Sequence, residues 1–588
     1  MDTYYTVERN VQIVIALLKH HNIHKIIASP GTTNITLVAS LQQDSFFQIY
    51  SSVDERSAAY LACGMAEESG EPVVLTCTGA TASRNYFPGL TEAYYRKLPI
   101  LAITSTQFEG RIGHLVAQVI NRSVQPKDTC VYSCSLPTIN SSDEEWNCVI
   151  KANEAFLALK RHGGGPVHIN LATTYNLDFS VKELPTCRFI DRIMPQDEFP
   201  ILSGSKIGVF VGSHSKWRDS EVEALEKFCH AHNAVVLVDH TSNYNGKYSF
   251  LFPLVGDQAT VSKKYVTFDT LIHVGNVSCI STPIISKQVW RVNPDGEIRD
   301  HYRNLRYVFE MSEELFFSHY SEGNGDDSQI ETCNRIYDNV YNSIPDIPFS
   351  MGYVAKHVSP LIPRNSSVYL GIFNSVRDFN FFKWDESIFG YSNVGGFGID
   401  GDNSSMIGAS LANPDRLFFG IIGDLAFFYD MNVIGNRHVG NNVRILLVNN
   451  GKGGEFRQYN HPAAIFKDED ADKYIAAAGH YGNQSQNLVR HFAEDLGYEY
   501  LTASSKDEFD GLTQVFLNPQ ITDKPILFEV FTDSHNDSMA NKLIRSCNYK
   551  DLDASEELKS IKKSAKNMIR GLVGQDGIDT VKKLLGQK

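Results

Sequence analysis

The sequence predicts an α/β protein of three doubly wound, parallel-sheet domains followed by a C-terminal helical tail. The chain has 588 residues, which is too long for a single hydrophobic core. Short apolar runs rich in β-branched residues alternate with helical patterns in three separate segments. Polar stretches at 178–205 and 323–329 separate these segments, so we expect three domains in series.

Each segment contains four runs that are typical of buried parallel strands. In the first domain, residues 1–185, they are 25–28, 73–77, 100–103 and 167–170. In the middle domain, residues 186–345, they are 207–211, 234–238, 271–274 and 289–292. In the third domain, residues 346–545, they are 368–370, 417–422, 443–448 and 526–530.

The tail, residues 546–588, has a different pattern. Asp553 and Glu556 are spaced as in a capping box, and apolar residues recur at helical spacing from Ala554 to Leu572. We therefore expect an amphipathic helix that packs on the body of the protein or on a partner subunit.

Composition excludes several classes of protein. A net charge of −14 argues against nucleic-acid binding. No apolar stretch reaches the length of a membrane span, and the N-terminus lacks the order of a signal peptide, so we expect a cytoplasmic protein. The ten cysteines lack the spacing of a disulfide framework. Cys130 and Cys134 have no second pair to complete a zinc site, which favours reduced thiols.

Two strand-like runs of the third domain each end at an oxygen ligand. Asp424 follows the run 417–422, and Asn450, 26 positions further on, follows the run 443–448. The carboxyl ends of parallel strands meet at one edge of a sheet, so we expect these side chains to lie together. Mg²⁺ accepts a carboxylate and an amide oxygen and takes further ligands from phosphate, which predicts a phosphorylated cofactor. The alternative is an ordinary crossover whose turns happen to contain Asp and Asn.

Glu55 begins a helix in the first domain. The small residues Ser57, Ala58 and Ala59 follow it, so this helix is expected to pack closely on its neighbour. Read alone, Glu55 is an acid stabilised by the dipole of its helix. It becomes a candidate catalytic group because the third domain of the same chain has the metal motif.

Several runs together carry a resemblance to a known superfamily: residues 54–58, 77–82, 165–170, 293–297, 398–401, 423–432 and 449–454. On these runs the chain resembles the thiamine-diphosphate-dependent decarboxylases and carboligases, in the order pyrimidine-binding, middle and diphosphate-binding domain. Within that superfamily it is most similar to the menaquinone-pathway succinyl-enolpyruvyl-hydroxycyclohexene-carboxylate synthases. The resemblance implies thiamine diphosphate and Mg²⁺ as cofactors. It also implies a homodimer or homotetramer with active sites at subunit interfaces.

The resemblance assigns roles to single residues. Glu55 would activate the cofactor through its pyrimidine ring, and Gln118 would face the reacting centre. Ile399 would hold the cofactor in its bent form, and the carbonyl of Lys452 would join Asp424 and Asn450 as a metal ligand. The residues implied to bind the cofactor are Thr78, Gly79, Asn374, Ser375, Ile399, Gly423, Asp424, Leu425 and Asn450. For Gln118, Thr78, Gly79, Asn374 and Ser375, a role in a turn or as a surface polar group is the alternative.

Three arginines of the synthases are missing. Thr33, Gln107 and Val394 stand at their positions. A guanidinium grips a carboxylate with two parallel hydrogen bonds, which these side chains cannot reproduce. We therefore do not expect 2-oxoglutarate and isochorismate to be the substrates.

The residues that could contact a different substrate are few. Thr32 and Thr33 replace the Ser-Arg of the synthases, and Gln107 replaces the second arginine. Arg84 and Arg377 are candidates to bind another acid, with a surface arginine as the alternative. Glu455 is acidic where the superfamily tends to be apolar, and the sequence predicts no function for it.

The expected activity is decarboxylation of a 2-oxo acid and transfer of the resulting acyl-anion equivalent to an acceptor. The alternatives are a simple decarboxylase that releases an aldehyde and a non-catalytic scaffold homologue. Some relatives hold FAD in the middle domain. The turn glycines Gly212 and Gly275 do not complete a dinucleotide fingerprint here, so a structural middle domain is expected. The sequence does not name the donor or the acceptor.

Overall fold

The computed structural model describes residues 4–479, 485–547 and 549. The described chain divides into two compact units, one made of residues up to 199 with 294–310, the other of 200–293 with the residues from 311 onward. The predicted helix of the tail, from 554 to 572, lies outside the described residues.

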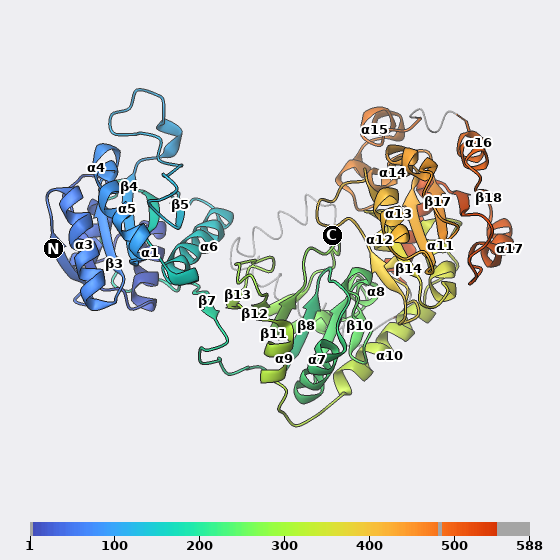
Figure 1. Ribbon diagram of the computed structural model, residues 1–588, viewed down its shortest axis with the longest axis horizontal. Helices are drawn as coiled ribbons and strands as arrows, with labels where there is room; N and C mark the ends of the chain where they lie inside the picture. The colour runs from blue at the N-terminus through green and yellow to red at the C-terminus, as the bar shows by residue number, and fades with distance from the viewer. Residues whose placement is uncertain (1–3, 480–484, 548, 550–588) are drawn as a thin grey trace, which may run out of the picture. The chain divides into compact units, whose positions relative to one another are not determined.

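The first unit, whose residues up to 199 are coloured from blue to teal in Figure 1, is built on a six-stranded sheet of order β2-β1-β3-β4-β6-β5. Its printed strand pairs are all parallel. The strands are β1 Lys25–Ala28, β2 Gln48–Ser51, β3 Val73–Cys77, β4 Ile100–Thr106, β5 Tyr132–Leu136 and β6 Val167–Ala172. The helices are α1 Arg9–His20, α2 Ile35–Gln42, α3 Glu55–Ser69, α4 Ala80–Asn85, α5 Phe87–Arg96 and α6 Ser142–Ala158.

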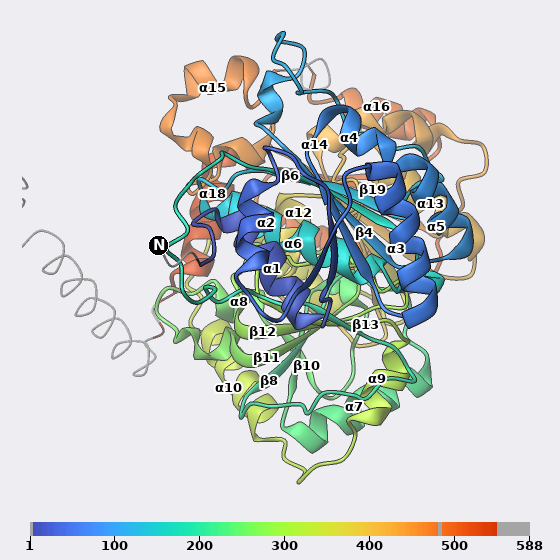
Figure 2. The ribbon, with the colours of Figure 1, turned by 90° about the vertical axis from the view of Figure 1, so that its left-hand side faces the viewer.

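Two hydrophobic cores cover the opposite faces of this sheet. Successive residues of a strand point to opposite faces. Val74 accordingly packs in one core with α1, α2 and α6, whereas Val73 and Leu75 pack in the other with α3 and α5. Figure 2 shows these two groups of helices on either side of the strands. The first sheet is therefore doubly wound.

The second sheet lies mainly in the second unit, where its strands follow the order β10-β9-β8-β11-β12. These strands are β8 Ile207–Val211, β9 Val235–Val238, β10 Ser249–Leu251, β11 Thr267–Val274 and β12 Ile285–Val292. The helices that follow in this unit are α7 Asp219–His232, α8 Pro253–Gly256, α9 Glu313–His319 and α10 Ser328–Asn342. In the first unit, β13 Leu305–Phe309 pairs in parallel with β7 Asp191–Ile193.

The loops at the switch point of the second sheet are closed onto each other. Gly212 N donates to Val274 O at 3.1 Å, and Asn276 N donates to Ser213 O at 2.8 Å. A Cβ on Gly212 would lie 2.0 Å from the carbonyl oxygen of Asn276. A dinucleotide pyrophosphate needs an open crevice at this point. The backbone of the two loops thus fills the position that a dinucleotide pyrophosphate would take, and the structural role of the middle domain stays a prediction.

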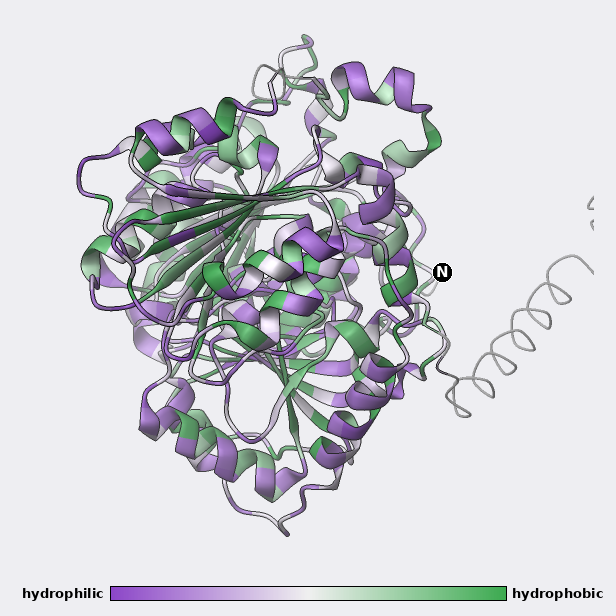
Figure 3. Ribbon diagram, turned by 90° about the vertical axis from the view of Figure 1, so that its right-hand side faces the viewer, coloured by the Kyte–Doolittle hydropathy of each residue, from purple (hydrophilic) through white to green (hydrophobic). Residues whose placement is uncertain are grey.

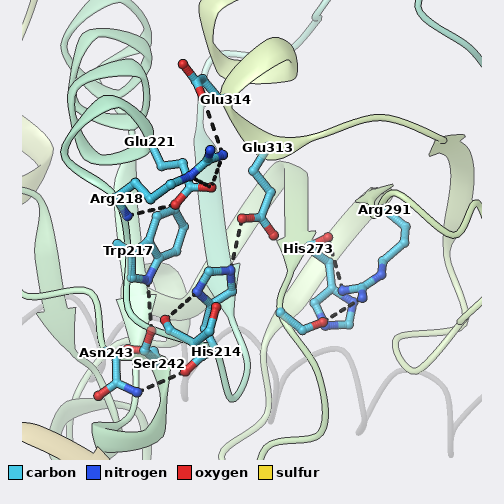
Figure 4. Close-up of polar contacts among 12 residues, drawn as sticks. His214, Trp217, Arg218, Glu221, Ser242, Asn243, His273, Arg291, Glu313 and Glu314 are labelled. Atoms are coloured by element: carbon cyan, nitrogen blue, oxygen red, sulfur yellow. Dashed lines mark hydrogen bonds and ion pairs between the residues drawn. The ribbon is translucent and has the colours of Figure 1, made fainter.

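Side chains reinforce the closed loop after β8 (Figure 4). His214 is nearly buried, and its Nε2 lies 3.0 Å from Glu313 Oε2 while its Nδ1 lies 2.8 Å from Ser215 O. The indole ring of Trp217 stacks on the imidazole at a centroid distance of 4.3 Å. The contact with the Glu313 carboxylate raises the pKa of His214 against the lowering effect of burial. The loop is therefore tied to α9.

The third sheet has the order β15-β14-β16-β17-β19-β18, again with parallel pairs. Figure 3 shows largely hydrophobic strands beside helices that carry hydrophilic residues. The strands are β14 Ser367–Leu370, β15 Phe389–Tyr391, β16 Phe418–Gly423, β17 Val443–Asn449, β18 Glu499–Ala503 and β19 Ile526–Phe531. The helices are α11 Met351–Val358, α12 Asn374–Phe379, α13 Asp402–Ala412, α14 Asp424–Tyr429, α15 Asp468–Tyr474, α16 Leu488–Asp495, α17 Lys506–Phe516 and α18 Ser534–Arg545.

The predicted fold class, three parallel α/β sheets, is confirmed. The domain boundaries at 185 and 345 stay predictions. All ten cysteines are free, as expected from their spacing. Within the described residues, no helix combines the length and hydrophobicity needed to cross a membrane.

Asp378 on α12 gives the third domain a pH-dependent stability. Its Oδ1 accepts a hydrogen bond from Asn541 of α18 at 2.8 Å, and its buried Oδ2 has no hydrogen-bond partner among the described residues. Burial raises the pKa of Asp378 to about 7. The folded state therefore holds a proton that the unfolded chain releases near pH 4, so the stability falls as the pH rises from about 4 to about 7.

We expect Asp378→Asn, which mimics the protonated acid, to stabilise the protein at pH 8 by on the order of a few kcal/mol and to have little effect at pH 4. Thermal unfolding measured by circular dichroism across this range checks the expectation. Substitution of the exposed Asp415 by Asn is the control. An equal effect of Asp378→Asn at both pH values would contradict the assignment.

Candidate active site

The candidate site is a cavity of about 410 Å³ at the carboxyl edge of the third sheet. Most of its wall comes from the segments that follow β14, β15, β16 and β17, and Met351 of α11 and Asp537 of α18 complete it. The chain runs from β14 outward to β15 and from β16 in the opposite direction to β17, so β14 and β16 flank the topological switch point. Open α/β sheets bind their ligands in this position.

Asp424 and Asn450 both line this cavity. β16 and β17 are parallel neighbours, and Gly423 pairs with Val448. Asp424, the first residue of α14, therefore leaves β16 at the level where Asn449 and Asn450 leave β17. Asp424 is only 2% exposed. The structure thus brings the two predicted ligands into one site, as expected from the sequence.

Asp537 of α18 fixes the amide of Asn450. Asn450 Nδ2 donates to Asp537 Oδ2 at 2.9 Å, and the other Asp537 oxygen accepts from Met351 N at 2.8 Å. With its NH₂ group engaged, the Asn450 amide leaves only its carbonyl oxygen as a potential metal ligand. Such second-sphere contacts orient ligands in metal sites. Sequence reasoning missed Asp537, which lies 87 residues from its partner.

Glycines in the loop after β17 leave space beside the amide of Asn450. Gly451 has a φ of 78°, which favours glycine. A Cβ on Gly454 would lie 2.6 Å from Asn450 Nδ2, so a larger residue there would displace the amide. The ammonium of Lys452 is turned to Asp472 of α15 at 2.5 Å. The lysine charge is therefore neutralised by an acid of its own domain.

The charges in the cavity suit a divalent cation that carries a phosphate. The charged side chains of its wall are Asp400, Asp424, Lys452, Glu455 and Asp537. Burial raises the pKa of Asp537 to about 6. Among the described residues, no group of three or more His, Cys, Asp or Glu is placed to hold a metal alone. One carboxylate, one amide and one backbone carbonyl fit Mg²⁺ that takes its remaining ligands from phosphate and water.

Arg377 and Glu455 form an ion pair at the wall of the cavity. Nη1 of Arg377 donates to both carboxylate oxygens, at 2.5 and 2.6 Å. The amide of Asn374 faces the same residue: in the orientation that satisfies both groups, its nitrogen donates to Glu455 Oε2 at 3.0 Å and its oxygen accepts from Glu455 N at 3.1 Å. The ring of Phe373 lies 5.5 Å from the guanidinium carbon. The structure thus pairs a predicted substrate residue with the acidic residue that had no predicted function.

The other predicted residues of the third domain lie in the same cavity. Its wall includes Ile399, which also packs against the core of the third sheet. Phe373 and Phe397 both have positive φ values, 67° and 56°, and their rings meet edge to face at 5.5 Å. Bulky residues rarely adopt this conformation, and such strain concentrates at functional sites. The remaining predicted cofactor residues in this wall are Asn374, Ser375, Gly423, Leu425 and the metal residue Lys452.

In the first unit, Glu55 is the first residue of α3, where Asp54 is the N-cap and accepts a hydrogen bond from Arg56 N. Asn85 Nδ2 donates to Glu55 Oε2 at 3.1 Å. The Glu55 side chain is partly exposed. The carboxylate is thus held at one oxygen and open to solvent, which suits a group that must contact a ligand.

The switch point of the first sheet lies between β1 and β3. Thr33 Oγ1 lies 2.6 Å from Thr78 Oγ1, and Gly79 N donates to Thr33 Oγ1 at 3.3 Å. Thr33 is 3% exposed. A Cβ on Gly31 would lie 2.5 Å from Thr78 Cβ, so the two loops are in close contact. Thr33 thus fixes the loops to each other beside Thr78 and Gly79, whose role in binding the cofactor stays a prediction.

The other predicted residues of the first unit are spread over its surface. Thr32 and Gln118 are exposed, and Gln118 has a φ of 64°. Arg84 donates to Asn121 O at 3.0 Å. Gln107 accepts a hydrogen bond from Arg111. The side chains of Arg84 and Gln107 therefore both form hydrogen bonds within the first unit.

Arg122 is a buried cation that the sequence did not reveal. Its guanidinium donates to Thr104 Oγ1 at 2.7 Å and to Asn170 Oδ1 at 2.5 Å. Burial lowers the pKa of Arg122 to about 10. Arg122 lies beside Gly79: a Cβ on Gly79 would be 3.4 Å from Nη2 of Arg122. An arginine in a polar stretch has no periodic signal, so only the folded structure identifies it as buried.

Comparison with known proteins agrees with this geometry. Residues 9–125 match the family of thiamine pyrophosphate enzymes, N-terminal TPP binding domain. This match covers the N-terminal part of the chain, which thus resembles the thiamine-diphosphate enzymes. The chain is similar to proteins named 2-succinyl-5-enolpyruvyl-6-hydroxy-3-cyclohexene-1-carboxylate synthase. The one from Bacteroides thetaiotaomicron is 28% identical over 91% of this chain and 98% of the relative. The one from Flavobacterium johnsoniae is 27% identical over 76% of this chain and 84% of the relative.

The similarity to these relatives confirms the predicted resemblance to the synthases and the expectation of a thiamine-diphosphate enzyme. The roles of single residues stay predictions.

We expect Asp537→Asn to weaken the binding of Mg²⁺ together with thiamine diphosphate by about 10- to 100-fold. The new NH₂ group would face Asn450 Nδ2, so the Asn450 amide would turn over and present its nitrogen to the metal. Fluorescence titration of the apoprotein with Mg²⁺ at fixed thiamine diphosphate measures the change. Asp510→Asn, which also alters a hydrogen-bonded carboxylate but lies outside the cavity wall, is the matched control. Unchanged affinity in Asp537→Asn would contradict the positioning role.

Proposed function

We propose that this protein decarboxylates a 2-oxo acid with thiamine diphosphate and Mg²⁺ and transfers the remaining acyl unit to an acceptor. The observation that supports the proposal most strongly is the placement of Asp424 and Asn450 at the switch point of the third sheet, with Asp537 orienting the amide. Transfer is preferred to simple release of an aldehyde because the similar proteins named above are synthases.

The residues of the third domain would hold the phosphate end of the cofactor. Asp424 and Asn450, with the carbonyl of Lys452, would bind the metal, which would neutralise the charge of the phosphates. Asn374 and Ser375 follow β14 beside them, and Ile399 would hold the cofactor in its bent form. When bound, thiamine diphosphate supplies a carbon nucleophile that adds to the 2-oxo group and accepts the electron pair left by departing CO₂.

Glu55 would move a proton. Hydrogen-bonded to the pyrimidine ring, the Glu55 carboxylate would exchange a proton with that ring and so favour its imino form, whose nitrogen would serve as the base that activates the nucleophile. Asn85 would keep the carboxylate in place. In the overall reaction the C1–C2 bond of the 2-oxo acid breaks, CO₂ leaves, and the electron pair on C2 forms a bond to a proton or to the carbonyl carbon of an acceptor.

We expect Glu55→Gln to lower kcat by at least about 100-fold while the affinity for thiamine diphosphate changes little, because the amide cannot take up the proton. Release of CO₂ from a panel of 2-oxo acids and a binding titration measure the two quantities. Glu68→Gln, on the exposed side of the same helix, is the control. Full activity in Glu55→Gln would refute the role, and the absence of CO₂ release from every 2-oxo acid would favour a non-catalytic scaffold.

We also propose that each active site combines Glu55 of one subunit with Asp424 of another. Subunits with Glu55→Gln and subunits with Asp424→Asn should each be inactive alone. When the two are mixed, dissociated and reassembled, hybrid dimers would regain one intact site, and about a quarter of the wild-type activity should return. The CO₂ assay on the reassembled mixture, with each variant reassembled alone as control, measures this recovery. No recovery despite hybrid formation would place both residues in one subunit.

A further inference from the structure

The carboxylate of Glu455 is held more completely than a surface acid. Both of its oxygens accept from Arg377 Nη1, and Asn374 lies within hydrogen-bond distance of its Oε2 and its backbone N. The side chains of Arg377 and Glu455 are 25% and 16% exposed. A pair so shielded loses less of its attraction to solvent than an exposed pair does. Glu455 is therefore a fixed part of the wall.

Glu455 stands between Arg377 and the cavity. Glu455 is among the described residues that line the cavity, and Arg377 is not. The ring of Phe373, which also lines the cavity, covers the guanidinium from another side. A ligand in the cavity thus meets a carboxylate and an aromatic ring in front of Arg377, the arginine that the sequence offers as a candidate to bind an acid.

We propose that Glu455 determines donor specificity by occupying Arg377, so that the site takes 2-oxo monocarboxylic acids with uncharged side chains and excludes dicarboxylic donors. The inference rests on the proposed function and names the substrate class of that site. Arg377 is the residue that could grip a second carboxylate, and Glu455 supplies that carboxylate from within the chain.

The rest of the cavity wall also favours a donor with an uncharged side chain. A donor carboxylate approaching Arg377 would be repelled by Glu455 at the shortest range, and Asp400 adds a further negative charge to the wall. The only lysine of the wall, among the residues described, is neutralised by Asp472. Apolar side chains supply much of the remaining surface: Met351, Ile372, Phe373, Phe397, Ile399 and Phe456. Such a wall accommodates an alkyl or aryl side chain.

The test compares two non-reactive probes of equal carbon number, glutarate and pentanoate. Their dissociation constants are measured by isothermal titration calorimetry on the full-length protein with Mg²⁺ and thiamine diphosphate. We expect Glu455→Gln to improve the affinity for glutarate relative to pentanoate by about 10- to 100-fold. Without the Glu455 carboxylate, Arg377 is free to pair with the second carboxylate of glutarate. The double variant Glu455→Gln with Arg377→Gln should lose this gain. Glu469→Gln, an exposed acid outside the wall, is the control.

An unchanged ratio of the two dissociation constants in a folded Glu455→Gln protein would overturn the proposal, and so would a gain that persists in the double variant. If Glu455→Gln tightens thiamine diphosphate and leaves glutarate unchanged, the freed Arg377 serves the cofactor and the proposal is likewise wrong. A separate assay of CO₂ release from 2-oxopentanoate and 2-oxoglutarate tests the proposed function. If neither acid releases CO₂, the proposed function is wrong, whereas the inference about Glu455 is still decided by the ratio of the two dissociation constants.

Discussion

The parallel pairing of β16 with β17 is the constraint on which the candidate site depends. Their register places Asp424 and Asn450 at the same level of one sheet edge, although a helix-containing crossover separates them in the chain. The hydrogen-bonded ladder sets this alignment, so neither side chain has to find the other during folding. Asp537 then orients the amide of Asn450, and the glycines of the loop after β17 leave space for that amide.

The strands that could be predicted from the sequence are those in the interior of the sheets. All four predicted runs of the first domain and all four of the third are observed strands, and each lies between two neighbours. The strands that went unpredicted in these sheets, β2, β5, β15 and β18, are the edges. An edge strand such as β2 is largely exposed and has no continuous apolar run to signal it.

The candidate site was predictable to the extent that local motifs encode it. Asp424 and Asn450 directly follow β16 and β17, and Asn374 and Ile399 lie in the segments after β14 and β15. What the sequence could not show were contacts between distant polar residues. Arg377 and Glu455 are 78 positions apart, and Asn450 and Asp537 are 87 apart. No periodicity relates such residues, because the pairing arises only when different elements pack together.

The closed loops of the second sheet also have a consequence for how this architecture can change. The same winding of strands and helices occurs three times in the chain, and in the middle copy backbone hydrogen bonds join the loops after β8 and β11 across the switch point. Exchanging side chains that point away from this contact leaves those bonds in place, whereas a side chain at Gly212 would displace the carbonyl group of Asn276. A longer loop would also separate them, so opening this switch point to a ligand requires a change in the backbone of the two loops and not only in their side chains.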